Sequence, residues 1–110
     1  MQILVTDSLT EEGIKKLREE GFQVTERKNI SESELVKIIP DYTALIVRSE
    51  TKVTAQVINA ASKLKVIGRA GTGLDNVDVE AATKKGIIVM NTPESNTISA
   101  AEHTISMLLA

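Results

Sequence analysis

The chain has 110 residues, 42% of them hydrophobic and 25% charged, with a net charge of −2. This length fits one small domain and excludes an enzyme that builds separate substrate and cofactor domains within the same chain. One Phe, one Tyr, no Trp and no basic excess argue against nucleic-acid binding, and the absence of Cys excludes disulfides and thiolate metal sites.

The beginning of the chain alternates apolar runs with amphipathic stretches. Residues 3–5 are apolar and rich in β-branched side chains, which predicts a buried strand and is too short for a signal peptide. Residues 8–20 follow as a helix that Gly21 can end in the left-handed conformation. Residues 22–24 predict a second strand, at a sheet edge because charged residues continue it.

The middle of the chain continues this alternation. Ser31 and Glu34 have the spacing of a capping box, and Pro40 is expected to end the helix that starts there. Residues 44–47 are continuously apolar and predict a strand, after which Thr54 caps a short helix.

In the last part, Asp78 is expected to cap a helix over residues 79–85, and Gly86 to end it. The remaining predicted elements are two strands and a final helix, at residues 65–67, 87–90 and 98–110. No stretch approaches the roughly 18 apolar residues of a membrane span.

Five apolar strands alternating with helices predict an α/β fold whose parallel sheet is covered on both faces. Their number and spacing favour a single flavodoxin-like, doubly wound domain with strand order 2-1-3-4-5. In such sheets ligands bind beyond the carboxyl ends of the strands, so the residues that follow each strand are the candidates for a site.

Two arginines, Arg48 and Arg69, follow the third and fourth predicted strands. Neighbouring strands lie about 4.8 Å apart, so both guanidinium groups can reach one anion. Arginine suits this task because its planar fork matches carboxylate and phosphate groups. The alternative interpretation is two solvated surface arginines.

A glycine run follows the fourth predicted strand, with glycines at 68, 71 and 73. Its order, G-x-x-G-x-G, differs from the G-x-G-x-x-G of dinucleotide-binding loops. Glycines let successive N–H groups face one concavity, which predicts an anion-binding nest with the Thr72 hydroxyl as a further donor. A tight turn without a ligand is the alternative.

Other candidates are weaker. His103, the single histidine, lies on the polar side of the last predicted helix, which indicates a structural or solvated role. Asp7 follows the first strand but lacks the neighbouring acids of a receiver domain's phosphorylation site. No His, Asp or Glu pair has metal-ligand spacing, so we expect no metal.

Four motifs carry a resemblance to a known family. They are Ile46-Val-Arg48-Ser49-x-Thr51, Gly68-Arg-Ala-Gly-Thr-Gly73-Leu-Asp-Asn76-Val-Asp78, Gly86-Ile-Ile-Val-Met-Asn91-Thr-Pro93 and Ser99-Ala-Ala-Glu102. Over its whole length the chain resembles the amino-terminal part of the D-isomer-specific 2-hydroxyacid dehydrogenases, in particular members that convert 3-phosphoglycerate to 3-phosphohydroxypyruvate for serine synthesis.

The resemblance implies a small anionic substrate, NAD as cofactor of the longer enzyme, and a set of substrate-binding residues. Thr72 would also touch the cofactor. No catalytic residue of the family falls within this chain, and His103 matches none. The implied substrate-binding residues are Arg48, Ser49, Arg69, Ala70, Gly71, Thr72, Gly73 and Asn96.

The resemblance also implies a domain division. We expect residues 1–97 to form a substrate-binding domain and residues 98–110 to begin a helix leading toward an NAD-binding domain absent from this chain. Ala110 then ends the chain within a helix, as in a truncation. We expect this cytoplasmic fragment to be inactive alone. Because the apolar side of residues 98–110 would be partly uncovered, we expect self-association through it, a rearranged helix or poor solubility.

Two other classes of function stay open from the residues alone. One is a free-standing binding module of flavodoxin or receiver type. The other is an interaction protein without a small ligand. The scarcity of aromatic side chains argues against a flavin, and the missing acidic cluster argues against a receiver domain.

Overall fold

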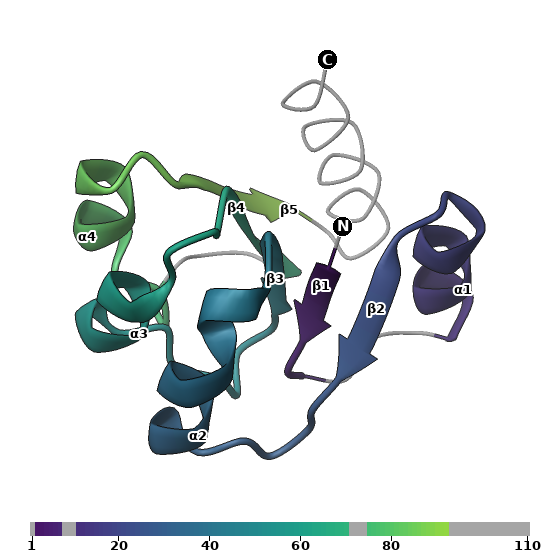
Figure 1. Cartoon of the computed structure of the whole chain (residues 1–110), viewed down its shortest axis with the longest axis horizontal. Coiled ribbons are helices and arrows are strands. Elements are labelled where there is room, and N and C mark those ends of the chain that lie inside the picture. The colour runs from purple at the N-terminus through teal and green to yellow at the C-terminus, as the bar shows by residue number, and fades with distance from the viewer. Residues whose placement is uncertain (1, 8–10, 71–74, 93–110) are drawn as a thin grey trace.

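The computed structural model describes residues 2–7, 11–70 and 75–92 (Figure 1). Five parallel strands form one sheet in the order β2-β1-β3-β4-β5, which confirms the predicted α/β class and strand order. The strands are β1 (Gln2–Val5), β2 (Gln23–Glu26), β3 (Ala44–Val47), β4 (Val66–Ala70) and β5 (Ile88–Thr92).

Burial along the strands follows their place in the sheet. All residues of β3 and β4 are buried, because both strands have neighbours on each side and layers above and below. In β2 the end residues Gln23 and Glu26 are exposed, and the strand lies at the sheet edge as predicted. The opposite edge is β5, where Ile88 is 42% exposed.

The described helices lie on both faces of the sheet (Figure 1). One face packs against several helices through a large apolar cluster that includes Leu4, Leu45 and Ile67. The other packs against a single described helix, through Ile14 and Leu17. The first group is α2 (Glu32–Ile38), the 3-10 turn η1 (Ile39–Asp41), α3 (Ala55–Ala60) and α4 (Val79–Lys84), and the single helix is α1 (Glu11–Glu19).

The predicted helix ends are confirmed by their hydrogen bonds. The side chains of Ser31, Thr54 and Asp78 each accept a hydrogen bond from a backbone N–H in the first helical turn. Gly21 and Gly86 have φ angles of +93° and +78°, the left-handed conformation expected after a helix.

The last two strands differ from their predicted bounds. β4 runs to Ala70, and β5 runs from Ile88 to Thr92, so both extend further toward the carboxyl edge. The ladder explains this: Gly68 lies between Ile46 and Met90, and pairing on both sides outweighs glycine's poor strand preference. The predicted helix over residues 98–110 lies outside the described residues.

Candidate functional site

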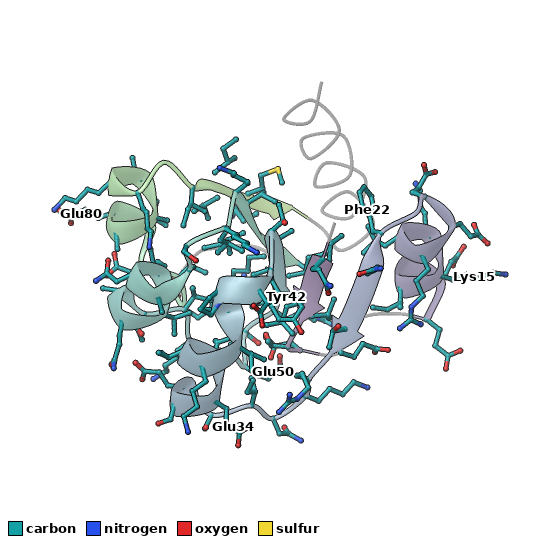
Figure 2. All side chains as sticks on the ribbon, viewed as in Figure 1. Lys15, Phe22, Glu34, Tyr42, Glu50 and Glu80 are labelled. Atoms are coloured by element: carbon teal, nitrogen blue, oxygen red, sulfur yellow. The ribbon has the colours of Figure 1, made fainter. Side chains whose placement is uncertain are left out.

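Buried polar groups distinguish one edge of the sheet. Most charged side chains point outward, as Figure 2 shows for Lys15 on α1 and Glu80 on α4. Among the described residues, the buried polar and charged ones are Thr6, Asp7, Thr51 and Arg69. The first two follow β1, the third follows β3 and the last lies near the end of β4, so all four gather at the carboxyl edge.

Arg69 lies within β4 and not in a loop after it, which corrects the prediction. It pairs with Val47 on one side and Asn91 on the other, and it is 9% exposed. Arg48 follows β3 and is exposed. The two arginines therefore come from adjacent strands, as predicted, with Arg48 one residue beyond the position that pairs with Arg69.

Asn76 joins the two segments that carry these arginines. Its Oδ1 accepts a hydrogen bond from Arg69 Nε at 2.5 Å. Its Nδ2 donates to the backbone carbonyl oxygens of Arg48, at 2.5 Å, and Thr51, at 2.7 Å. The single acceptor atom and both N–H donors of this amide are thus engaged.

Asp7 holds the loop of residues 48–51, called the Arg48 loop, by accepting hydrogen bonds from the backbone N–H groups of that loop. Its Oδ2 accepts from the N–H of Arg48 at 2.7 Å and of Thr51 at 3.1 Å, and its Oδ1 accepts from the Thr51 hydroxyl at 2.5 Å. Asp7 is 5% exposed, and a carboxylate with these three donors is well suited to burial. Its structural role argues against the receiver-type alternative.

The backbone of Asn76 is itself anchored. Its carbonyl oxygen accepts from Val53 N at 2.7 Å, and Asp78 N donates to Val53 O at 2.9 Å. These bonds accompany a parallel bridge between Val53 and Val77, both of which are buried. The side chain of Asn76 therefore starts from a fixed point between the strand ends and α4.

The remaining predicted site residues fall into two groups. Ser49 is exposed in the bend after Arg48, and Ala70 is the buried last residue of β4, opposite Thr92. The predicted nest is wrong in one respect, because Gly68 belongs to the β4 ladder and not to a loop. Gly71, Thr72, Gly73 and Asn96 lie outside the described residues, as does His103.

The described residues do not fit an NAD site. In dinucleotide-binding loops the glycine turn leads directly into a helix, whose N-terminus holds the pyrophosphate. Here Gly68 lies inside β4, residues 75–78 precede the next helix, and that helix, α4, has six residues. The described residues therefore supply no dinucleotide-binding turn.

Neither a metal-binding cluster nor a membrane span occurs in the described part of the chain. It contains no group of three or more His, Cys, Asp or Glu residues arranged to hold a metal ion. None of its helices combines the length and apolar character needed to cross a membrane.

Sequence reasoning missed Asn76 and the role of Asp7. Asp7 comes directly after the first strand, and Asn76 lies inside the second of the four motifs. A polar residue that follows a buried strand, or that lies between a strand and the next helix cap, was the available signal.

Residues 3–106 match the model of the family "D-isomer specific 2-hydroxyacid dehydrogenase, catalytic domain". The chain belongs to this family. Its parallel α/β fold agrees with that membership.

Its named relatives include D-3-phosphoglycerate dehydrogenases. The enzyme of Rattus norvegicus is 58% identical over 108 residues, which cover 98% of this chain and 20% of the relative. That of Archaeoglobus fulgidus is 50% identical over 110 residues, which cover 100% of this chain and 21% of the relative. The chain spans about a fifth of the length of the curated relatives it matches.

A solved structure extends the likeness to three dimensions. It is the NAD+-bound 3-phosphoglycerate dehydrogenase of Entamoeba histolytica, with a TM-score of 0.77 and 36% sequence identity. The match covers 98% of this chain and 38% of that one.

Proposed function

We propose that this chain is the substrate-binding part of an NAD-dependent D-3-phosphoglycerate dehydrogenase that oxidises 3-phosphoglycerate to 3-phosphohydroxypyruvate. The observation that carries the proposal is Arg69, a residue 9% exposed within a central strand, whose guanidinium is held by Asn76 beside the Arg48 loop. A buried, oriented guanidinium at the carboxyl edge of a doubly wound sheet is suited to binding a small anion.

In the proposed mechanism this chain binds and orients the substrate. Arg48 and Arg69 bind its anionic groups, while Ser49 and the backbone around Ala70 line the same edge. The family resemblance adds Gly71, Thr72, Gly73 and Asn96 to the substrate contacts and Thr72 to the cofactor contacts. Fixing the substrate in this way contributes orientation to catalysis, and no proton transfer is assigned to this chain.

NAD, which accepts the hydride when bound, is assigned to a domain outside this chain. Within the longer protein we propose residues 1–97 as the substrate-binding domain and 98–110 as the start of the helix leading away from it. We further propose a cytoplasmic location, which fractionation of the source cells would test.

Titration of the isotope-labelled chain with 3-phosphoglycerate, followed by NMR, tests the proposal. We expect saturable shifts at residues 48–51 and 69–70, and affinity reduced about tenfold or more in Arg48→Ala and in Arg69→Ala, because each loses charge-assisted hydrogen bonds.

Arg18→Ala is the matched control, since it removes the same charge from an exposed position on α1. Its affinity should stay within about twofold of the wild-type value, as expected for a distant charge in salt. A wild-type chain that shows no saturable binding, or equal losses in all three variants, would contradict the proposed function.

A further inference from the structure

Asn76 has a position that the proposed function does not by itself explain. It contacts both arginine-bearing segments at once, with Arg69 Nε on one side of its amide and the carbonyl oxygens of Arg48 and Thr51 on the other. We propose that Asn76 is a positioning residue that aligns Arg69 with the Arg48 loop so that both arginines bind one anion. This inference rests on the proposed function.

The bond to Arg69 fixes the direction of its guanidinium. A guanidinium is planar, so a hydrogen bond at Nε sets the plane in which the two Nη groups lie. The 2.5 Å contact to Oδ1 provides this restraint. An orientation fixed before binding reduces the side-chain entropy that the ligand would otherwise have to remove.

The two bonds of Nδ2 fix the other segment. Arg48 directly follows β3, and its carbonyl oxygen and that of Thr51 bracket a four-residue loop. Asp7, which follows β1, accepts hydrogen bonds from the N–H groups of the same two residues. The loop is thus held through its acceptors by Asn76 and through its donors by Asp7.

The chemistry of the position requires an amide. Aspartate has the acceptor for Arg69 but no donor for the two carbonyl oxygens, and leucine has the shape of asparagine but neither group. The backbone bond from Val53 to the Asn76 carbonyl at 2.7 Å keeps the amide at a fixed distance from both partners. Asn76→Asp therefore removes the contacts of Nδ2 and keeps the contact to Arg69, whereas Asn76→Leu removes both.

The test measures two quantities in the wild-type chain, Asn76→Leu and Asn76→Asp. One is the affinity for 3-phosphoglycerate, measured by NMR on folded protein. The other is the hydrogen-exchange rate of the Arg69 Nε–H, which reports its hydrogen bond directly. Asn59→Leu is the control, because Asn59 is exposed on α3 and its backbone carbonyl makes its described contact.

In Asn76→Leu we expect affinity about tenfold or more weaker and Arg69 Nε–H exchange about tenfold or more faster. In Asn76→Asp the exchange should stay slow, because Oδ1 is kept, while binding weakens through the released loop and the added negative charge. Asn59→Leu should leave both quantities at the wild-type values.

Wild-type affinity and exchange in Asn76→Leu would overturn the inference, and so would weak binding with unchanged exchange. If Asn76→Leu does not fold, Asn76→Ser takes its place, and an Arg69 Nε–H that exchanges as fast as that of exposed Arg18 in the wild type already contradicts the proposal. A wild-type chain that binds no 3-phosphoglycerate would count against the proposed function. The Arg69 Nε–H exchange rates of the wild-type chain and Asn76→Leu would then show by themselves whether Asn76 positions Arg69.

Discussion

Asp7 and Asn76 hold the same loop through complementary groups. The carboxylate of Asp7 has only acceptors and takes the N–H groups of Arg48 and Thr51, whereas the Nδ2 of Asn76 donates to their carbonyl oxygens. A short loop held on both sides retains little conformational freedom. This restraint places Arg48 beside Arg69 before any ligand arrives.

We predict that Asp7→Ala lowers the free energy of unfolding by about 2–4 kcal/mol, because two backbone N–H groups and the Thr51 hydroxyl lose their acceptor. Asp7→Asn keeps one acceptor oxygen and should lose about half as much. Urea denaturation measures both. Asp75→Ala, at an exposed position, is the control and should change stability by less than about 0.5 kcal/mol. An equal loss in Asp7→Ala and the control would contradict this role.

We predict that Gly86→Ala lowers stability by about 1–2 kcal/mol through backbone strain alone. Gly86 has a φ of +78°, and a Cβ there would meet no atom within 4 Å, so no steric contact contributes. Gly86→Asn should lose less, since asparagine tolerates this conformation better than alanine. Thermal unfolding of the two variants checks the order, and a larger loss for Asn would refute the explanation.

At the scale of elements, short helices and strands here depend on contacts at their ends. α3 and α4 have six residues each, too few to be stable in isolation. The C-terminal end of α3 receives a cap from a neighbouring element: Lys85, directly after α4, donates from Nζ to the carbonyl oxygens of Ile58 and Asn59 at 3.0 and 2.7 Å. This cap ties the two helices together where their own hydrogen bonds end.

We predict that Lys85→Met lowers stability by about 0.5–1 kcal/mol, because the last carbonyl oxygens of α3 lose a cationic donor. Lys84→Met is the matched control. Lys84 pairs with Glu80 at 3.3 Å, but both side chains are more than three-quarters exposed, so this ion pair contributes about 0–0.5 kcal/mol. Chemical denaturation of both variants measures the loss in the free energy of unfolding, and a greater loss for Lys84→Met would disprove the cap.

At the scale of the whole molecule, the proposed function makes this chain one side of an active site. In the part of the chain that the structure describes, the buried polar and charged residues lie at one edge of the sheet, where the ends of β1, β3 and β4 meet. Among the described residues, this edge shows no glycine turn that leads directly into a helix of the kind that holds a dinucleotide. The proposed function assigns binding of the anion to this chain and binding of NAD to another part of a longer protein.

We predict that the purified chain, given NAD and 3-phosphoglycerate, forms no NADH, because no catalytic residue or cofactor fold is assigned to it. Absorbance at the NADH band measures this, with a complete D-3-phosphoglycerate dehydrogenase as the positive control. Turnover that copurifies with the chain and disappears in Arg69→Ala would contradict the proposal that this chain binds the substrate but does not catalyse the reaction alone.

Self-association through residues 98–110 stays a prediction, because this segment lies outside the described residues. Its sequence places Ile105 and Leu108 on one apolar helical side. Sedimentation velocity over a range of concentrations should show association in the wild type and less in Leu108→Lys. Monomers at every concentration in both proteins would rule it out.

Local sequence patterns were sufficient for much of the architecture. The alternation of apolar runs and capped helices predicted the parallel sheet and its order, because burial on both faces requires continuous apolar strands. Ser31, Thr54 and Asp78 predicted helix starts correctly, since a cap bonds within three residues of itself. The motifs also placed the chain in its family.

The tertiary structure alone decided how the polar edge is built. Asp7 and Arg48 are 41 residues apart in the chain, and Asn76 lies 28 residues from Arg48, so no local pattern could pair them. The length of β4 was decided in the same way, because pairing with β3 and β5 draws Gly68 and Arg69 into the ladder. Pairing with β3 and β5 buries Arg69, which the sequence predicted in a loop after the strand, and the hydrogen bond to Asn76 orients its guanidinium.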